Sequence, residues 1–178
     1  IYDMYGFPKE LYELRWPAEG SYRLAHQVRE RIRSAVEIDN SWGIDHGTWS
    51  VLCRMYPAAD VPVVQLSIDG TAPAETHYRI GRELASLRDE GVLLLGSGNI
   101  VHDLARIDWE NEGGYPWADE FDNWIRDAIL AGDHEKPIQY ETGGSAARQA
   151  FRTPEHYLPL LYVLGAVDEA DVVTVFNE

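Results

Sequence analysis

The spacing of apolar residues predicts several helices along the chain. Between residues 21 and 36, apolar side chains recur at every fourth position with charged residues between them: Leu24, Val28, Ile32 and Val36. This period is typical of an amphipathic helix, and Ser21 is a suitable cap for its first turn. The positions of apolar residues also predict helices over residues 73–90 and 117–131.

Pro154 marks the start of a last predicted helix. Proline is favoured in the first turn of a helix, and Thr153 before it is suited to cap that turn. The helix carries His156 near its N-terminus.

Three other stretches have the composition of buried strands. Residues 61–69 and 91–99 contain continuous apolar runs, and residues 170–178 are a third, shorter candidate. Because a segment of helix length separates the first two, they are expected to pair in parallel. The sequence therefore predicts an α/β fold, a three-layer domain with a mostly parallel central sheet and helices on both faces. Residues 141–150 are predicted to be a loop that runs into small residues.

Length and charge narrow the classes of function. The chain has 178 residues, which fits one domain spanning residues 1–178. Its formal net charge of -15 repels phosphate backbones and anionic lipid, so neither nucleic acid nor a membrane surface is an expected partner. A single cysteine, Cys53, and the lack of an apolar run of bilayer length favour a cytoplasmic protein. The chain begins with Ile1 rather than methionine, so we expect a fragment.

Three of the six histidines lie at the ends of predicted elements, beside glycine or proline. They are His46 in WGIDHGTW, His102 in GSGNIVHD and His156 in TPEHYLP. Histidine changes charge near neutral pH and is the commonest metal ligand, so a convergent set would make an acid/base or metal site. A histidine taken singly is more often a polar residue with a structural role. The position of His102 after a predicted strand favours function, because sites in α/β sheets form at the carboxyl ends of strands.

Other features fit a site less well. The glycines of GSGN could cradle a phosphate, but no complete phosphate-binding motif follows them and the net charge disfavours polyanions. His77, early in a helix, and His134, in a polar turn, are expected to be solvated. Trp42 and Trp49 flank His46 and could line an apolar pocket, although such tryptophans are usually core residues.

Five motifs occur in order along nearly the whole chain. They are GFP followed by LY (residues 6–12), WGIDHGTW (42–49), YPAADVPVVQLSID (56–69), GSGNIVHDL (96–104) and TPEHYLPLLYVLGA (153–166). As a set, these motifs closely resemble the DODA-type branch of the class III (LigB-like) extradiol ring-cleavage dioxygenases.

The resemblance implies a non-haem metal enzyme that opens a catechol ring next to its hydroxyls and inserts both atoms of O2. The implied metal is Fe(II), with Zn(II) as another occupant. In this family the metal-binding histidines come from HGSP-like and SAHW-like motifs and from TPEH, which here supplies His156. His102 matches a histidine at the metal centre, either a further ligand or the acid/base that moves protons. His46 matches a residue that orients substrate or bound oxygen.

The sequence departs from the family pattern in two respects. Asp103 stands where the family usually has asparagine, and its charge would raise the pKa of His102 if the two were close. The HGSP and SAHW motifs are absent, so further histidine ligands are expected upstream of Ile1 and the domain is expected to be truncated at both ends. The implied partners are a catechol such as DOPA and O2, in a monomer or homodimer. The alternative hypothesis is a non-catalytic metal- or small-aromatic-binding protein on the same scaffold.

Overall fold

The computed structural model describes residues 4–111 and 113–176. Its internal contacts divide the chain into two compact units, Ile1–Ser67 and Ile68–Glu178, and each unit is described by itself. None of the helices in the described ranges is both long and apolar enough to cross a membrane.

Residues 4–67 of the first unit form three α-helices: α1 (Lys9–Glu13), α2 (Tyr22–Arg31) and α3 (His46–Met55). The predicted helix over residues 21–36 is confirmed at its start, where the Ser21 hydroxyl accepts a hydrogen bond from the Leu24 amide at 3.2 Å. It ends at Arg31, because Ile32 adopts extended backbone and is buried. Four buried apolar residues form the core of this unit: Met4, Ile32, Trp49 and Leu52.

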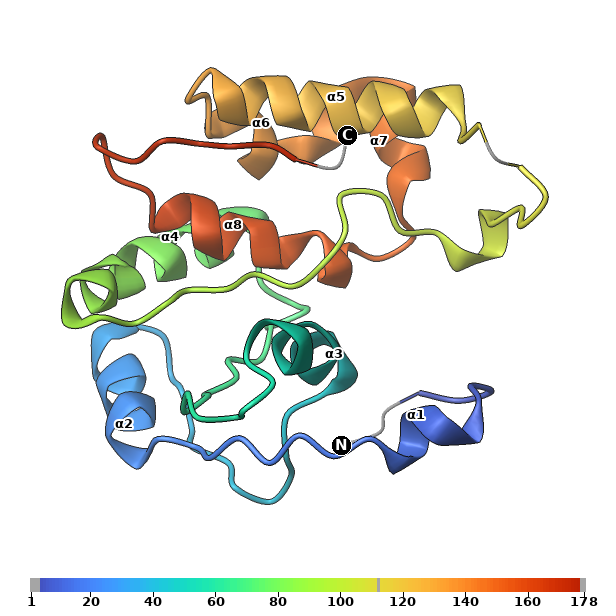
Figure 1. Ribbon diagram of the computed structural model, residues 1–178. Helices are drawn as coiled ribbons and strands as arrows, with labels where there is room; N and C mark the ends of the chain where they lie inside the picture. Colours follow the sequence, from blue (N-terminus) through green and yellow to red (C-terminus); the bar gives the residue numbers. More distant parts are fainter. Residues whose placement is uncertain (1–3, 112, 177–178) are drawn as a thin grey trace. The chain divides into compact units, whose positions relative to one another are not determined.

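The second unit contains α-helices and short 3-10 helices (Figure 1). In chain order these elements are α4 (Ala74–Leu84), η1 (Ala85–Glu90), η2 (Leu104–Arg106), α5 (Pro116–Leu130), α6 (Glu135–Ile138), η3 (Tyr140–Gly143), α7 (Gly144–Ala150), η4 (Pro154–His156) and α8 (Leu158–Gly165). The predicted helices at 73–90, at 117–131 and after Pro154 are confirmed.

The predicted loop at residues 141–150 is wrong. This stretch forms η3 and α7, and three alanines of α7 are buried: Ala146, Ala147 and Ala150. They pack with Phe121 and Ile125 of α5 and with one face of α8. Alanine favours helix, and its small side chain lets two helices approach closely, so a run without large apolar residues still forms a buried helix.

The predicted three-layer α/β fold with a mostly parallel central sheet is also wrong, since no sheet occurs in residues 4–111 and 113–176. Residues 92–98 run along α8 instead of beside another strand (Figure 1). In the described residues, β-type pairing is limited to one isolated parallel bridge between His102 and Phe151. Residues 61–69 and 171–176 form no strand, and residues 177–178 lie outside the described residues. Apolar runs favour an extended backbone, but a sheet also needs a neighbouring strand to share its hydrogen bonds.

Helices α4 and α8 lie side by side because glycines let their backbones approach closely (Figure 1). A Cβ atom added at Gly81 would overlap the Tyr162 carbonyl group, and one at Gly165 would overlap the Tyr78 carbonyl oxygen. Each helix therefore has a glycine where it meets the backbone of the other.

A buried polar pair joins the same two helices. His77, which we expected to be solvated, is fully buried, and its Nδ1 lies 2.9 Å from the Tyr162 hydroxyl. Its Nε2 lies 3.3 Å from the Ala72 carbonyl, so a neutral imidazole donates to Ala72 and accepts from Tyr162. Burial lowers the pKa of His77 and raises the pKa of Tyr162 to about 12. His134, also expected to be solvated, is half-buried and lies 2.9 Å through Nδ1 from the Tyr78 hydroxyl.

Gly81→Ala should destabilise the protein, because the new methyl group would force α4 away from α8. Overpacking of this kind costs about 1–3 kcal/mol. The free energy of unfolding in urea measures the loss. Gly70→Ala is the matched control, since a Cβ at Gly70 meets nothing within 4 Å. Equal stabilities for the two variants would contradict the close approach of the helices.

Stability should fall as the pH drops below the ordinary histidine pKa of 6.5, in part because of His77. Above that pH both states hold the imidazole neutral; below it the unfolded chain takes up the proton first, because burial depresses the folded pKa. The free energy of unfolding should be measured from about pH 8 to about pH 5. His77→Gln should show a smaller loss across this range than the wild type, and parallel curves would contradict the assignment.

Candidate functional site

Two of the three predicted site histidines lie against each other in the second unit. The imidazole rings of His102 and His156 are stacked, with centroids 3.6 Å apart and planes inclined by 12°. His102 precedes η2, and His156 is the last residue of η4, one residue before the start of α8. The structure thus brings together residues that are 54 positions apart in the sequence.

Backbone hydrogen bonds hold the two histidine-bearing segments side by side. The Asn99 amide donates to the His156 carbonyl at 2.8 Å, and the His102 amide donates to the Ala150 carbonyl at 2.7 Å. The second of these bonds belongs to the parallel bridge between His102 and Phe151. The position of each imidazole is therefore set by main-chain contacts as well as by ring stacking.

The glycines of GSGN make this approach possible. A Cβ atom at Gly98 would overlap the His156 carbonyl oxygen, and one at Gly96 would lie 2.7 Å from the Pro159 carbonyl oxygen. Any larger residue at Gly98 would push the segment away from η4. The motif that resembled a phosphate cradle in the sequence is thus a packing surface against the start of α8.

Glu155 provides negative charge beside the imidazole pair. Its Oε1 accepts a hydrogen bond from the Thr153 hydroxyl at 2.8 Å and lies 3.7 Å from His156 Nδ1. The Thr153 bond lowers the pKa of the Glu155 carboxyl, and the charges of His156 and His102 lower it further. Thr153 was predicted to cap the helix, but its hydroxyl serves Glu155 instead. His156 Nδ1 is buried while its side chain is 38% exposed, so another edge of the ring faces solvent.

Asp103 directs its carboxylate to arginines. It accepts a hydrogen bond from the Ala105 amide at 3.1 Å and lies 3.1 Å from Arg106 Nε and 3.2 Å from Arg152 Nε. The guanidinium groups of Arg106 and Arg152 therefore compensate the negative charge of the Asp103 carboxylate.

His46 belongs to the first unit and is described there by itself. It is exposed and begins α3, after Asp45, whose carboxylate accepts from the Thr48 amide at 3.1 Å. The Gln65 side chain reinforces this cap by bonding to Asp45 and Thr48. Trp49 is buried, as expected for a core residue, whereas Trp42 is exposed. Convergence of His46 with His102 and His156 stays a prediction.

Two neighbouring imidazoles are the right kind of donor for a non-haem metal, which binds histidine nitrogens readily. A stable site needs three or four protein ligands. Within the described parts of the chain, no group of three or more histidine, cysteine, aspartate or glutamate side chains is placed to hold an ion. His102 and His156 are therefore donors of the right type, and the described residues do not complete a ligand set.

Sequence reasoning did not single out Glu155 or Arg152. The signal for Glu155 was present in TPEH, where a hydroxyl residue stands two positions before the glutamate. Arg152 had no such signal, because its partner Asp103 lies far away in the sequence.

Comparison with known proteins identifies the family. Residues 1–177 match the LigB family, described as the catalytic LigB subunit of aromatic ring-opening dioxygenase. The chain belongs to the LigB family. This confirms the resemblance to extradiol dioxygenases that the five motifs predicted.

Named relatives of this LigB chain support the assignment. It is 44% identical to 4,5-DOPA dioxygenase extradiol of Escherichia coli K12, over 98% of this chain and 66% of that protein. It is 39% identical to 4,5-DOPA dioxygenase extradiol of Beta vulgaris, over 95% of this chain and 65% of that one. The chain thus spans just under two thirds of the length of either relative.

A solved structure has the same arrangement of the chain. The crystal structure of an uncharacterized protein from Escherichia coli K12 matches with a TM-score of 0.83 and 42% identity. The match covers 93% of this LigB chain and 70% of that one.

Gly98→Ala should separate the stacked imidazoles, because its methyl group would collide with the His156 carbonyl. In NMR spectra, the nuclear Overhauser effect between the ring protons of His102 and His156 should weaken or vanish. Gly70→Ala, at a position with open space, should leave the effect intact. An undiminished effect in Gly98→Ala would show that the glycine is not needed for the pairing.

Proposed function

We propose that this LigB chain is part of an extradiol ring-cleavage dioxygenase. The substrate would be a catechol such as DOPA, opened next to its hydroxyls with insertion of both atoms of O2. The observation that carries the proposal is the stacked His102–His156 pair, in a chain that matches the LigB family over residues 1–177. The names of the relatives from Escherichia coli and Beta vulgaris support the reaction class and the choice of DOPA for a first test.

A non-haem metal, Fe(II) with Zn(II) as an alternative, would be held in part by His156, with His102 as a further ligand when substrate is absent. The chemistry that Fe(II) supplies when bound is activation of O2 and polarisation of the catechol oxygens. His156 is suited to a ligand role because its Nδ1 is buried and another edge of the ring is exposed.

His102 would move the substrate proton. A catechol hydroxyl must lose its proton as the ring is attacked, and a ring nitrogen of His102 can accept it because imidazole titrates near neutral pH. Stacking on His156 fixes the plane of the His102 ring, so its nitrogens keep one orientation towards the substrate. His46 would orient substrate or bound oxygen. A cytoplasmic location and a monomeric or homodimeric state belong to the same proposal.

A second candidate function is non-catalytic binding of a metal or a small aromatic molecule on this scaffold. The observation that favours it is the incomplete donor set within the described residues. Catalytic turnover distinguishes the two, because a binding protein would retain metal or catechol without consuming oxygen.

The test is oxygen uptake by the intact gene product, reconstituted with Fe(II) without air and then given a panel of catechols that includes DOPA. We expect oxygen uptake and a yellow ring-opened product. His102→Ala should lower kcat by about 100-fold or more, because general acid/base groups contribute at least that much. His156→Ala should abolish turnover and also reduce bound metal.

His26→Ala is the matched control, since His26 lies in α2 and contacts Tyr22 and Arg29. It should retain wild-type turnover and metal content. Bound metal without oxygen uptake on any catechol would reject the dioxygenase and favour the binding protein. Full turnover in His102→Ala would reject the role given to that residue.

A further inference from the structure

The Asp103 carboxylate links the two segments that carry the paired histidines. Its side chain is only 5% exposed, yet it contacts Arg106 on its own segment and Arg152 on the segment that leads to His156. A carboxylate so far removed from water is unfavourable unless positive charge and hydrogen bonds compensate it. Both arginines and the Ala105 amide supply that compensation.

The Asp103–Arg152 pair continues the backbone bridge in register. His102 lies opposite Phe151 in the parallel bridge, and the next residue on each segment is Asp103 and Arg152. Backbone pairing does not continue beyond this bridge in the described residues, so the side-chain contact holds the two segments together at the next position. It ties the segments together one residue beyond His102.

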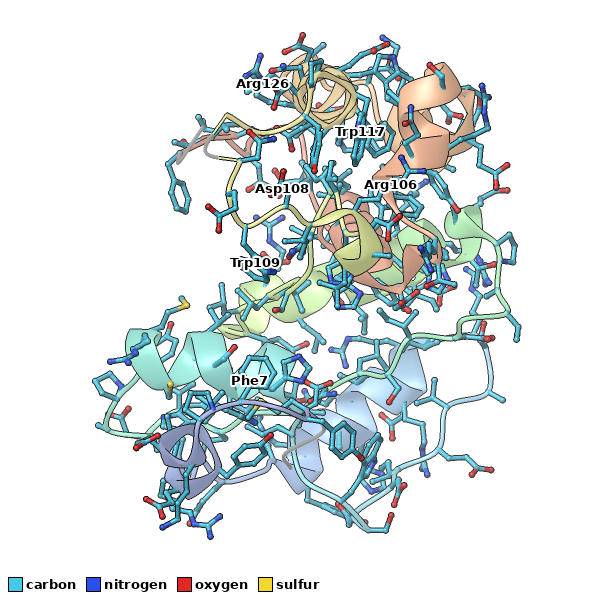
Figure 2. All side chains as sticks on the ribbon, turned by 90° about the vertical axis from the view of Figure 1, so that its right-hand side faces the viewer. Phe7, Arg106, Asp108, Trp109, Trp117 and Arg126 are labelled. Carbon is cyan, nitrogen blue, oxygen red and sulfur yellow. The ribbon has the colours of Figure 1, made fainter. Side chains whose placement is uncertain are left out.

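Arg106 fixes the position of the Asp103 carboxylate. Its Nη1 donates to the Gln149 side chain at 3.1 Å, and its guanidinium carbon lies 5.5 Å from the centre of the Trp117 ring. Figure 2 shows Arg106 and Trp117 close together. Arg152 is 72% exposed and contacts Asp103 through Nε. Trp117 and Gln149 thus contact Arg106, and Arg106 contacts the Asp103 carboxylate. Asp103 in turn contacts Arg152.

We propose that Asp103 is a positioning residue that holds His102 in register with His156 through its ion pair with Arg152. The proposal rests on the proposed function for its kinetic test, but its structural consequence can be measured separately. Arg152 is mostly exposed, and Asp103 keeps Arg106 and the Ala105 amide when Arg152 is replaced, so Arg152→Gln should change geometry at the imidazoles more than it changes the melting temperature. In this chain residue 103 contacts two guanidinium groups, and a neutral amide there would attract them less strongly than a carboxylate does.

The kinetic test compares Asp103→Asn, Arg152→Gln and the double variant with the wild type. Asp103→Asn should lower kcat by about 10- to 100-fold with little change in KM, since small displacements of catalytic groups have effects of that size. The effects of the two substitutions should not add: the double variant should be about as slow as Asp103→Asn alone. Additive losses, or a kcat within about twofold of wild type in Asp103→Asn, would overturn the proposal.

Asp171→Asn is the matched control. It removes a carboxylate that also bonds an arginine from another segment, Arg88, remote in sequence from both histidines. This variant should leave kcat unchanged. If it lowers kcat as much as Asp103→Asn does, loss of an ion pair in general explains the result and the positioning role is rejected.

A second readout does not depend on turnover. The nuclear Overhauser effect between the ring protons of His102 and His156 should weaken in Asp103→Asn and in Arg152→Gln, and persist in Asp171→Asn. If the wild type opens no catechol, the proposed function fails, and this measurement still decides the inference. An unchanged effect in Asp103→Asn would overturn it.

Discussion

The close approach of α4 and α8 is the constraint on which the second unit depends. Two glycines, Gly81 and Gly165, remove the side chains that would otherwise keep the helix backbones apart. The buried bond between His77 and Tyr162 then fixes how the helices are turned about their axes. Since only Tyr157 separates η4 from α8, the position of α8 also sets the position of His156. A packing requirement far from the imidazoles thus determines where one of them lies.

The imidazole pair depends on the same kind of backbone contact at a smaller scale. Gly96 and Gly98 let an extended segment lie directly on the start of α8, and two main-chain hydrogen bonds hold it there. No large side chain separates the segments at this point, so the rings of His102 and His156 meet face to face. Charged groups surround this arrangement: Glu155 lies beside His156, and Asp103 is held between two arginines.

The sequence predicted helices better than it predicted pairing between segments. Periodic apolar positions located α2, α4 and α5 because each helix buries one face. Helix α7 was missed because its buried residues are alanines, which give little apolar contrast. The sheet was wrong for a different reason: composition reports a preference for extended backbone and carries no information on which segment lies alongside. The ends of predicted elements and the family motifs singled out His102 and His156 together with His46, whereas the roles of Gly98 and Asp103 required knowledge of their distant partners.

The extended segments have a further consequence for the protein in solution. Leu93 and Leu95 in one segment, and Val172 and Phe176 in another, present apolar side chains to water. In the described residues the backbone beside them forms no ladder of hydrogen bonds. Extended apolar edges of this kind are templates for pairing between molecules. A high protein concentration should therefore favour self-association through these segments. The net charge of -15 opposes it, because the molecules repel one another.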